Sequence, residues 1–355
     1  MRTWIGIGCA FGVAAFLGAL HYAGASAVLQ FGVGIVALAL LAWTVGVGTE
    51  TVGARFGPAT TGVLQSTLGN LPELFIVIFA LRAGEIVVAQ TSILGSLLAN
   101  ALLVLGLGIL AGAWRAEDGV MRFHPRLPND TTMLLMLVVF LIAILSTSVT
   151  TGDTASTHAV AISSIGAVLI LLVYAAWLAS YLRAGAGQEP AIEEHHAPPL
   201  GFGVGLGVLA LAGIAAAFTS EWFVSVIDPA VEELRISKAF TGLVIVAIAG
   251  NAVENVVGIQ LAWKRRFDLA ISVVKNSVAQ IAAFLYPALV LVSLLFAERL
   301  TFGIPTGAGG LVLVVALVFA ALAIWQITGD GEATGYEGLA LVATYAVLAT
   351  VVWFE

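Results

Sequence analysis

The sequence contains about eleven long apolar runs, each near the roughly 20 residues that a membrane-spanning helix needs. Within lipid a chain must satisfy its own backbone hydrogen bonds, and only helices and closed barrels do so. The runs lie near residues 4–22, 28–52, 60–82, 86–112, 131–150, 158–183, 202–226, 238–262, 268–297, 306–327 and 336–354. They predict an all-α integral membrane protein with about 11 transmembrane helices.

Composition agrees with a location in lipid. Only 10% of the residues are charged, against about 25% in a typical soluble domain. The single cysteine, Cys9, excludes an intramolecular disulfide and a cysteine-based metal cluster. No Walker-type or dinucleotide-binding glycine motif is present. We therefore expect membrane lipid as the surroundings, with no cofactor, no nucleic acid and no obligate protein partner.

One long polar, proline-containing break, residues 184–200, divides the chain. The expected parts are an extra N-terminal transmembrane helix (1–27), a first five-helix repeat (28–183), an acidic cytoplasmic linker (184–200) and a second five-helix repeat (201–355). Residues 1–27 could alternatively be a cleavable signal sequence, since an apolar run there precedes Ala25-Ser26-Ala27. Within the linker, residues 193–196 (Glu-Glu-His-His) are read as solvated, with a regulatory metal site as the alternative.

Lysine and arginine are more frequent in the loops on the side of the N-terminus. This excess places the N-terminus and the linker in the cytoplasm, because basic loops stay on that side. The expected location is a multi-pass protein in a prokaryotic-type plasma membrane.

A Gly-Asn-x-x-Glu motif occurs twice, each time inside an apolar run. The first copy is GNLPEL at residues 69–74 and the second is GNAVEN at residues 250–255. Ser96 and Ser277 follow the two motifs at equal spacing, and one further glutamate precedes each motif, Glu50 and Glu221. The two motif helices are an odd number of helices apart, so they run in opposite directions. This pattern predicts inverted repeats with a substrate site near mid-bilayer.

Glu73 and Glu254 are the central residues of the predicted site. A carboxylate at the bilayer centre costs at least about 2.5–3.5 kcal/mol, so each needs a proton, a cation or a basic partner. Burial and a second carboxylate both favour the protonated form, so an empty pair would hold protons and release them when a cation arrives. Hard cations such as calcium bind six to eight oxygens. The candidate cation and proton ligands are Glu73, Glu254, Asn70, Asn251, Ser96, Ser277 and Gln280, with the two glutamates as the metal ligands.

The glycines and Pro72 are expected to break the motif helices, which lipid tolerates only where the freed backbone lines a cavity. Simpler interpretations stay open. Each buried glutamate could pair with a lysine or with backbone, and the asparagines could join helices. The two serines could be packing contacts, and Glu50 and Glu221 could be solvated at helix ends.

At its two motifs the sequence resembles the calcium/cation exchanger superfamily, and most nearly its calcium/proton exchanger (cation/proton antiporter) branch. The likeness extends to residues 80–84, 94–100, 268–270 and 277–282. It implies two inverted five-helix repeats and alternating access. It also implies that Glu73 and Glu254 are the central acids, Asn70 and Asn251 their amide partners, and Glu50 and Glu221 part of the cation pathway.

Several residues depart from that branch and are candidate modulators. Pro72 stands where small residues are usual, and Asn255 stands where the branch usually has a histidine. Lys275 adds a cation at membrane depth. Its side chain either reaches toward an interface or pairs structurally, or else it neutralises a carboxylate and displaces part of the bound charge.

The sequence thus predicts a secondary-active antiporter that exchanges calcium for protons by alternating access. A sodium-coupled calcium exchanger and a monovalent cation/proton exchanger are the alternatives. A membrane-embedded enzyme is disfavoured, because the histidines lie at expected helix ends or loops and no nucleophile–base set is visible.

Overall fold

The computed structural model describes residues 2–53, 55, 68–124, 126–150, 152, 154–185, 200–304 and 310–354. Nearly all of the linker expected at 184–200 lies outside these residues, including the acidic and histidine cluster at 193–196. Within the described chain, 9 helical segments are long and apolar enough to cross a membrane. They are α1 (Arg2–Tyr22), α2 (Ala27–Gly53), α5–η1–α6 (Ile86–Leu98, Ala99–Val104, Leu105–Arg115), α7 (Arg126–Thr150), η2–α8 (Thr154–His158, Ala159–Gly185), α9 (Phe202–Ser225), α14–η4–α15 (Phe267–Gln280, Ile281–Leu285, Tyr286–Ser293), α16 (Gly310–Gly329) and α17 (Gly335–Trp353).

A bent pair of helices counts as a tenth span only if its two arms are taken together, and a re-entrant loop would have the same form. Its first arm contains α11 (Lys238–Phe240), η3 (Thr241–Val246) and α12 (Ala247–Gly250), and its second arm is α13 (Ala252–Trp263). The two arms meet at 58°. The run expected near 60–82 is described from residue 68 and forms α4 (Leu71–Ala83). The prediction of an all-α membrane protein is confirmed.

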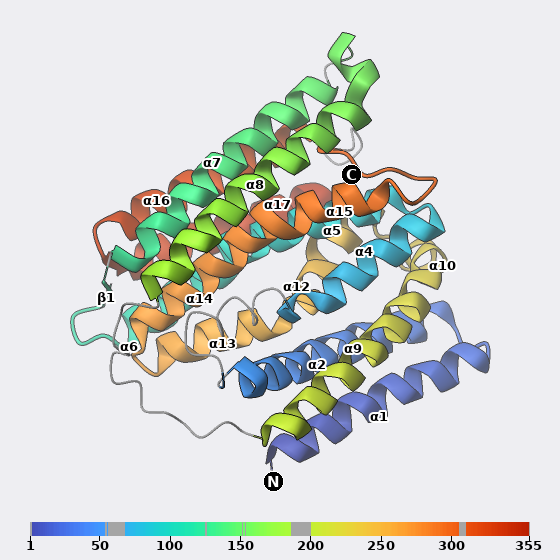
Figure 1. Cartoon of the computed structure of the whole chain (residues 1–355). Helices are drawn as coiled ribbons and strands as arrows, with labels where there is room; N and C mark the ends of the chain where they lie inside the picture. The colour runs from blue at the N-terminus through green and yellow to red at the C-terminus, as the bar shows by residue number, and fades with distance from the viewer. Residues whose placement is uncertain are drawn as a thin grey trace. The chain divides into compact units, whose positions relative to one another are not determined.

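The chain divides into two compact units, described here separately. Unit 1 contains Met1–Phe79, Val173–Arg235 and Ala249–Val253. In it, α1, α2 and α9 lie side by side (Figure 1), with the short helix α10 (Ile227–Leu234) against α2. Residues of α2 and α9 form one apolar cluster, Val45, Val52, Leu209 and Ala212. Phe31 and Phe223 stack with ring centroids 5.2 Å apart.

Unit 2 contains Ala80–Leu172, Ile236–Ile248 and Glu254–Glu355. Here α5 and η3 approach until Gly95 touches the Leu243 backbone and Gly242 touches Thr91. A β-carbon at either glycine would overlap the opposite helix, and such close approach is how small residues hold membrane helices together. The pair fixes the position of α5, which carries Ser96.

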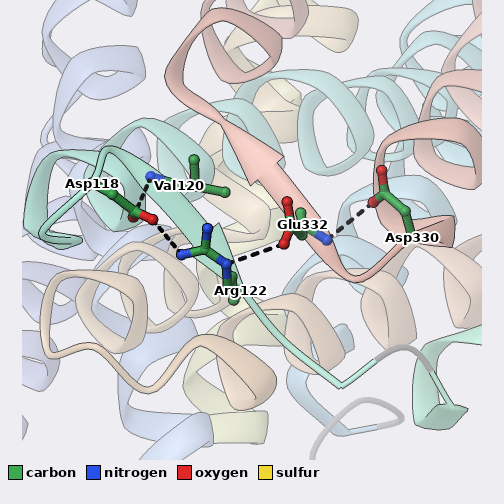
Figure 2. Close-up of polar contacts among 5 residues, drawn as sticks. All are labelled: Asp118, Val120, Arg122, Asp330 and Glu332. Atoms are coloured by element: carbon green, nitrogen blue, oxygen red, sulfur yellow. Dashed lines mark hydrogen bonds and ion pairs between the residues drawn. The ribbon is translucent and has the colours of Figure 1, made fainter.

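A small antiparallel ribbon in unit 2 joins two loops outside the spans. Its strands are β1 (Val120–Arg122) and β2 (Glu332–Thr334), with Arg122 opposite Glu332. Figure 2 shows Arg122 donating to Asp118, at 2.6 Å, and to Glu332, at 3.1 Å. The Arg122 hydrogen bond holds the pKa of the exposed Asp118 carboxyl below its usual range. The sequence did not predict this ribbon, because three-residue strands carry no periodic signal.

Candidate functional site

Both Gly-Asn-x-x-Glu motifs interrupt their helices at the asparagine. Asn70 lies in the turn before α4, and Asn251 lies in the turn between α12 and α13. Each glutamate is therefore the third residue of the helix that follows. Pro72 is the second residue of α4, where its missing N–H would have no intrahelical acceptor in any case. The predicted breaks are present, and Pro72 marks the start of a helix.

Glu73 is a buried carboxylate in the first turn of α4, with 1% of its surface exposed. The partial positive charge at a helix N-terminus favours a carboxylate there. Asn70 and Asn251 are buried as well, 3% and 0% exposed. The β-carbon of Glu73 lies 3.6 Å from where a β-carbon on Gly250 would be. Unit 1 therefore brings the glutamate of the first motif against the glycine of the second.

Glu254 is the third residue of α13. Its side chain lies outside what the structure describes, so its proximity to Glu73 stays a prediction.

In unit 2, Ser277 and Gln280 lie three residues apart on α14 and share a helical face. Ser277 Oγ accepts a hydrogen bond of 3.4 Å from Asn100 Nδ2. Gln280 is 3% exposed, and its Oε1 accepts no hydrogen bond from the described residues. Ser96 is fully buried on α5. A buried amide oxygen with a free lone pair suits a hard cation.

Asn100 is a buried polar neighbour of the candidate ligand Ser277 that the sequence analysis did not single out. The sequence analysis included it only in residues 94–100, which resemble the exchanger superfamily. It is nevertheless a polar residue inside an apolar run, one helical turn after Ser96. The structure buries it completely, at the second residue of η1. There it reaches Ser277, far away in the sequence.

Three π-helical turns flank the candidate residues. One, η1, begins three residues after Ser96, and η4 begins directly after Gln280. The third, η3, ends shortly before Gly250. Single π turns inside α-helices occur frequently at functional sites. None was predicted, because a wider turn inside a uniformly apolar run leaves no pattern in the sequence.

The modulator candidates have defined partners. Lys275 is 1% exposed, and its Nζ donates to Thr328 Oγ1 at 2.7 Å. The Lys275 side chain is therefore buried and hydrogen-bonded to Thr328, and its role in the site stays a prediction. Asn255 Nδ2 donates to the Ile248 carbonyl at 3.2 Å. That hydrogen bond spans the break in the bent helix. It supplies a donor to a carbonyl near the end of α12, where the backbone offers none.

Glu50 and Glu221 lie on α2 and α9 of unit 1. Glu50 is exposed near the end of its helix, and Glu221 is half-buried. Their part in a cation pathway stays a prediction.

No group of three His, Cys, Asp or Glu side chains gathers as a metal site among the described residues. Among these residues, a bound cation would therefore need amide, hydroxyl and backbone oxygens as ligands in addition to carboxylate oxygens. In unit 1 the motif asparagines offer such atoms, and in unit 2 Ser277 and Gln280 do.

Comparison with known proteins decides the family. The sequence model described as "Sodium/calcium exchanger protein" matches residues 26–182 and 204–354, most of the chain. The chain belongs to the sodium/calcium exchanger protein family. The resemblance predicted from the two motifs is therefore confirmed, and the family is one of transporters.

Several named proteins are similar to this chain over most of its length. The Ca(2+)/H(+) antiporter ChaA of Bacillus subtilis is 32% identical over 332 residues, covering 91% of each chain. A Ca(2+)/H(+) antiporter of Synechocystis is 31% identical over 360 residues, covering 95% of this chain and 94% of that one. The solved structure of native YfkE superposes with a TM-score of 0.81 at 27% identity, covering 99% of this chain and 100% of that one. The H+/Ca2+ exchanger CAX, at 13% identity and a TM-score of 0.72, shares the fold.

Proposed function

We propose that this chain is a secondary-active antiporter that exchanges calcium for protons across a membrane. The observation that carries the proposal is the buried Glu73, held in the first turn of α4 against Gly250 of the second motif. The names of the relatives support calcium and protons as the exchanged ions.

In the proposed cycle, Glu73 and Glu254 bind calcium in one state and protons in the other. A calcium ion would replace the protons on the two carboxylates, because both forms neutralise the buried charge. Asn70, Asn251 and Gln280 would supply amide oxygens, and Ser96 and Ser277 hydroxyl oxygens, toward the six to eight that calcium prefers. Asn100 would orient Ser277 through their hydrogen bond.

Alternating access would expose this site to one side of the membrane at a time, as expected of inverted repeats. We further propose that residues 28–183 and 201–355 are those repeats, with residues 1–27 as an extra helix and 184–200 as a cytoplasmic linker. The N-terminus would lie in the cytoplasm, as the distribution of basic residues indicates.

Calcium flux into proteoliposomes tests the function. Uptake should be driven by an acidic interior and should not need a sodium gradient. A calcium uptake rate that does not depend on the pH gradient would contradict proton exchange. Uptake that requires sodium would favour the sodium-coupled alternative.

Glutamine substitutions test the site. Glu73→Gln and Glu254→Gln should each abolish exchange while the protein still elutes as a folded species. Glu298→Gln, which changes an exposed glutamate, is the matched control and should transport normally. Normal flux in either motif variant would refute the site assignment.

A further inference from the structure

The chain that follows α15 enters the interior of unit 2 without forming a helix. Residues 294–299 are mostly exposed, whereas residues 300–304 are irregular chain in which Leu300, Phe302 and Ile304 are 1%, 0% and 4% exposed. Loops usually run over the surface, because buried irregular backbone leaves polar groups that need partners. Residues 300–304, here called the plug segment, therefore need hydrogen bonds from the helices around them.

Side chains of two spans supply hydrogen bonds to the plug segment. Gln90 Nε2 on α5 donates to the Gly303 carbonyl at 2.8 Å. The Tyr286 hydroxyl on α15 donates to the Thr301 carbonyl at 3.1 Å. Both carbonyls thus have donors from helices that also carry proposed ligands, because α5 carries Ser96 and α15 continues the helix of Gln280.

Further contacts hold the middle and the start of the plug segment. Ser163 Oγ on α8 accepts from the Phe302 N–H at 3.1 Å, and the rings of Phe302 and Tyr286 meet edge to face with centroids 4.8 Å apart. Ser293 Oγ at the end of α15 accepts from the Leu300 N–H at 2.9 Å. These hydrogen bonds join backbone to side chains, and water can replace each of them at modest cost. The segment can therefore leave without the unwinding of a helix.

The plug segment lies beyond the proposed ligands in one direction along both helices. Gln90 precedes Ser96 by six residues on α5, and Tyr286 follows Gln280 by six residues on α14–η4–α15. Six residues of helix span about 9 Å. Because both helices bind the same segment, it crosses them at about this axial distance from the candidate ligands.

The opposite ends of these two spans lie at the β1–β2 ribbon. There α6 ends at Arg115 beside β1, and Asp268 in the first turn of α14 accepts from the His124 main chain. Arg122 and residues 264–266 (Lys-Arg-Arg) add positive charge to the loops at this end. Basic loops indicate the cytoplasmic end of a span. The proposed orientation therefore places the plug segment at the non-cytoplasmic end.

We propose that the plug segment is a removable seal, which closes the unit 2 part of the cation site on the non-cytoplasmic side. This inference rests on the proposed function, since it takes Ser96 and Gln280 as ligands and alternating access as the cycle. When the site opens to the non-cytoplasmic side, the hydrogen bonds with Gln90, Tyr286 and Ser163 break and the segment moves away. When the site opens to the cytoplasm, they form again.

A reversible disulfide across the plug segment tests this movement. Ser163→Cys with Phe302→Cys, in a Cys9→Ser background, places thiols where a short side chain now reaches the opposite backbone N–H, which is within reach of a disulfide. Oxidation should lower calcium/proton exchange in proteoliposomes by roughly tenfold or more, because a tethered seal cannot open. Dithiothreitol should restore exchange. Ser293→Cys with Leu300→Cys is the second pair, used if the first does not fold or oxidise.

A disulfide elsewhere in unit 2 controls for the cysteines and the oxidant. Val120→Cys with Thr334→Cys joins two residues that already pair across the β1–β2 ribbon, outside the spans. Oxidation of this pair should leave exchange unchanged. Equal exchange by the oxidised and the reduced plug pair would overturn the proposal, because the segment would then not have to move.

Calcium binding separates a blocked movement from a distorted fold. The oxidised plug pair should still bind calcium, with an affinity within about twofold of that of the reduced protein, because a site open to the cytoplasm needs no movement of the plug segment. Loss of binding together with exchange would assign the segment a structural role and overturn the proposal.

The proposed function and the seal fail in different ways. Wild-type protein that does not exchange calcium for protons contradicts the proposed function. Wild-type protein that exchanges normally, with equal exchange by the oxidised and the reduced plug pair, contradicts only the seal.

Discussion

Glu73 lies next to Gly250: a β-carbon built on Gly250 would lie 3.6 Å from the β-carbon of Glu73 and 3.9 Å from its α-carbon. These are ordinary van der Waals separations, so one methyl group fits at Gly250 in contact with Glu73. The contact joins the two sequence motifs inside unit 1. It also makes the size of residue 250 a probe of the position of Glu73.

Substitutions of graded size at Gly250 should therefore separate folding from transport. Gly250→Ala should fold and keep measurable calcium exchange, whereas Gly250→Val should displace Glu73 and reduce exchange by about tenfold or more, since small misplacements cost that much. Flux in proteoliposomes and elution from size-exclusion chromatography measure the two properties. Equal activity in the two variants would show that Glu73 does not depend on this contact.

Gln280→Leu should weaken calcium binding without lowering stability. The Oε1 atom of Gln280 accepts no described hydrogen bond in its buried position, so an apolar replacement of similar shape removes an unpaired polar group. We expect the calcium KM to rise by roughly tenfold while the melting temperature is unchanged or higher. Gln260→Leu, which changes an exposed glutamine of α13, controls for the leucine. A large loss of thermal stability in Gln280→Leu would contradict this account.

Asn255 should stabilise the bent helix through its donor group. Asn255→Ala leaves the Ile248 carbonyl without the amide that it accepts from, at a cost of about 1 kcal/mol. Asn255→Asp keeps the shape but sets an acceptor against an acceptor, so it should lower the melting temperature further than alanine does. Thermal unfolding in detergent compares the three proteins. An aspartate variant as stable as wild type would show that the hydrogen bond contributes nothing.

The ribbon allows a pH prediction outside the membrane spans. Arg122 lowers the pKa of Asp118 from its ordinary value of 3.8, so the interaction is fully present above pH 3.8 and is lost as the pH falls through the lower folded value. Arg122→Gln should return the pKa of Asp118 toward 3.8, as carbon-13 NMR of the labelled carboxyl would show. Because Asp118 and Arg122 are exposed, the melting temperature at neutral pH should barely change.

Much of the fold could be predicted because hydropathy dictates it. The run expected at 131–150 lies within α7, and the run at 336–354 matches α17 within a residue or two. The β1–β2 ribbon and α10 escaped prediction, since both are short and carry no long apolar signal. The three π turns escaped for a related reason: their residues are as apolar as the helices around them.

The candidate site was predictable where it depends on local sequence. Glycine before asparagine predicted both helix breaks, and the buried glutamate followed from its place in an apolar run. The partners of Asn100 and Lys275 were not predictable, because Ser277 and Thr328 lie on other helices and no spacing rule connects them. Long-range pairing of this kind depends on tertiary packing alone.

The π turn at Ile281–Leu285 marks a place where this helix can change length. A π turn holds one residue more than an α turn, so deleting a single residue there would restore a regular helix. Positions beyond the deletion would keep nearly the same orientation relative to Ser277 and Gln280, and Tyr286 would stay near Phe302. One-residue deletions in this stretch should therefore be less damaging than deletions in the regular part of α14, which would rotate every later position by about 100°.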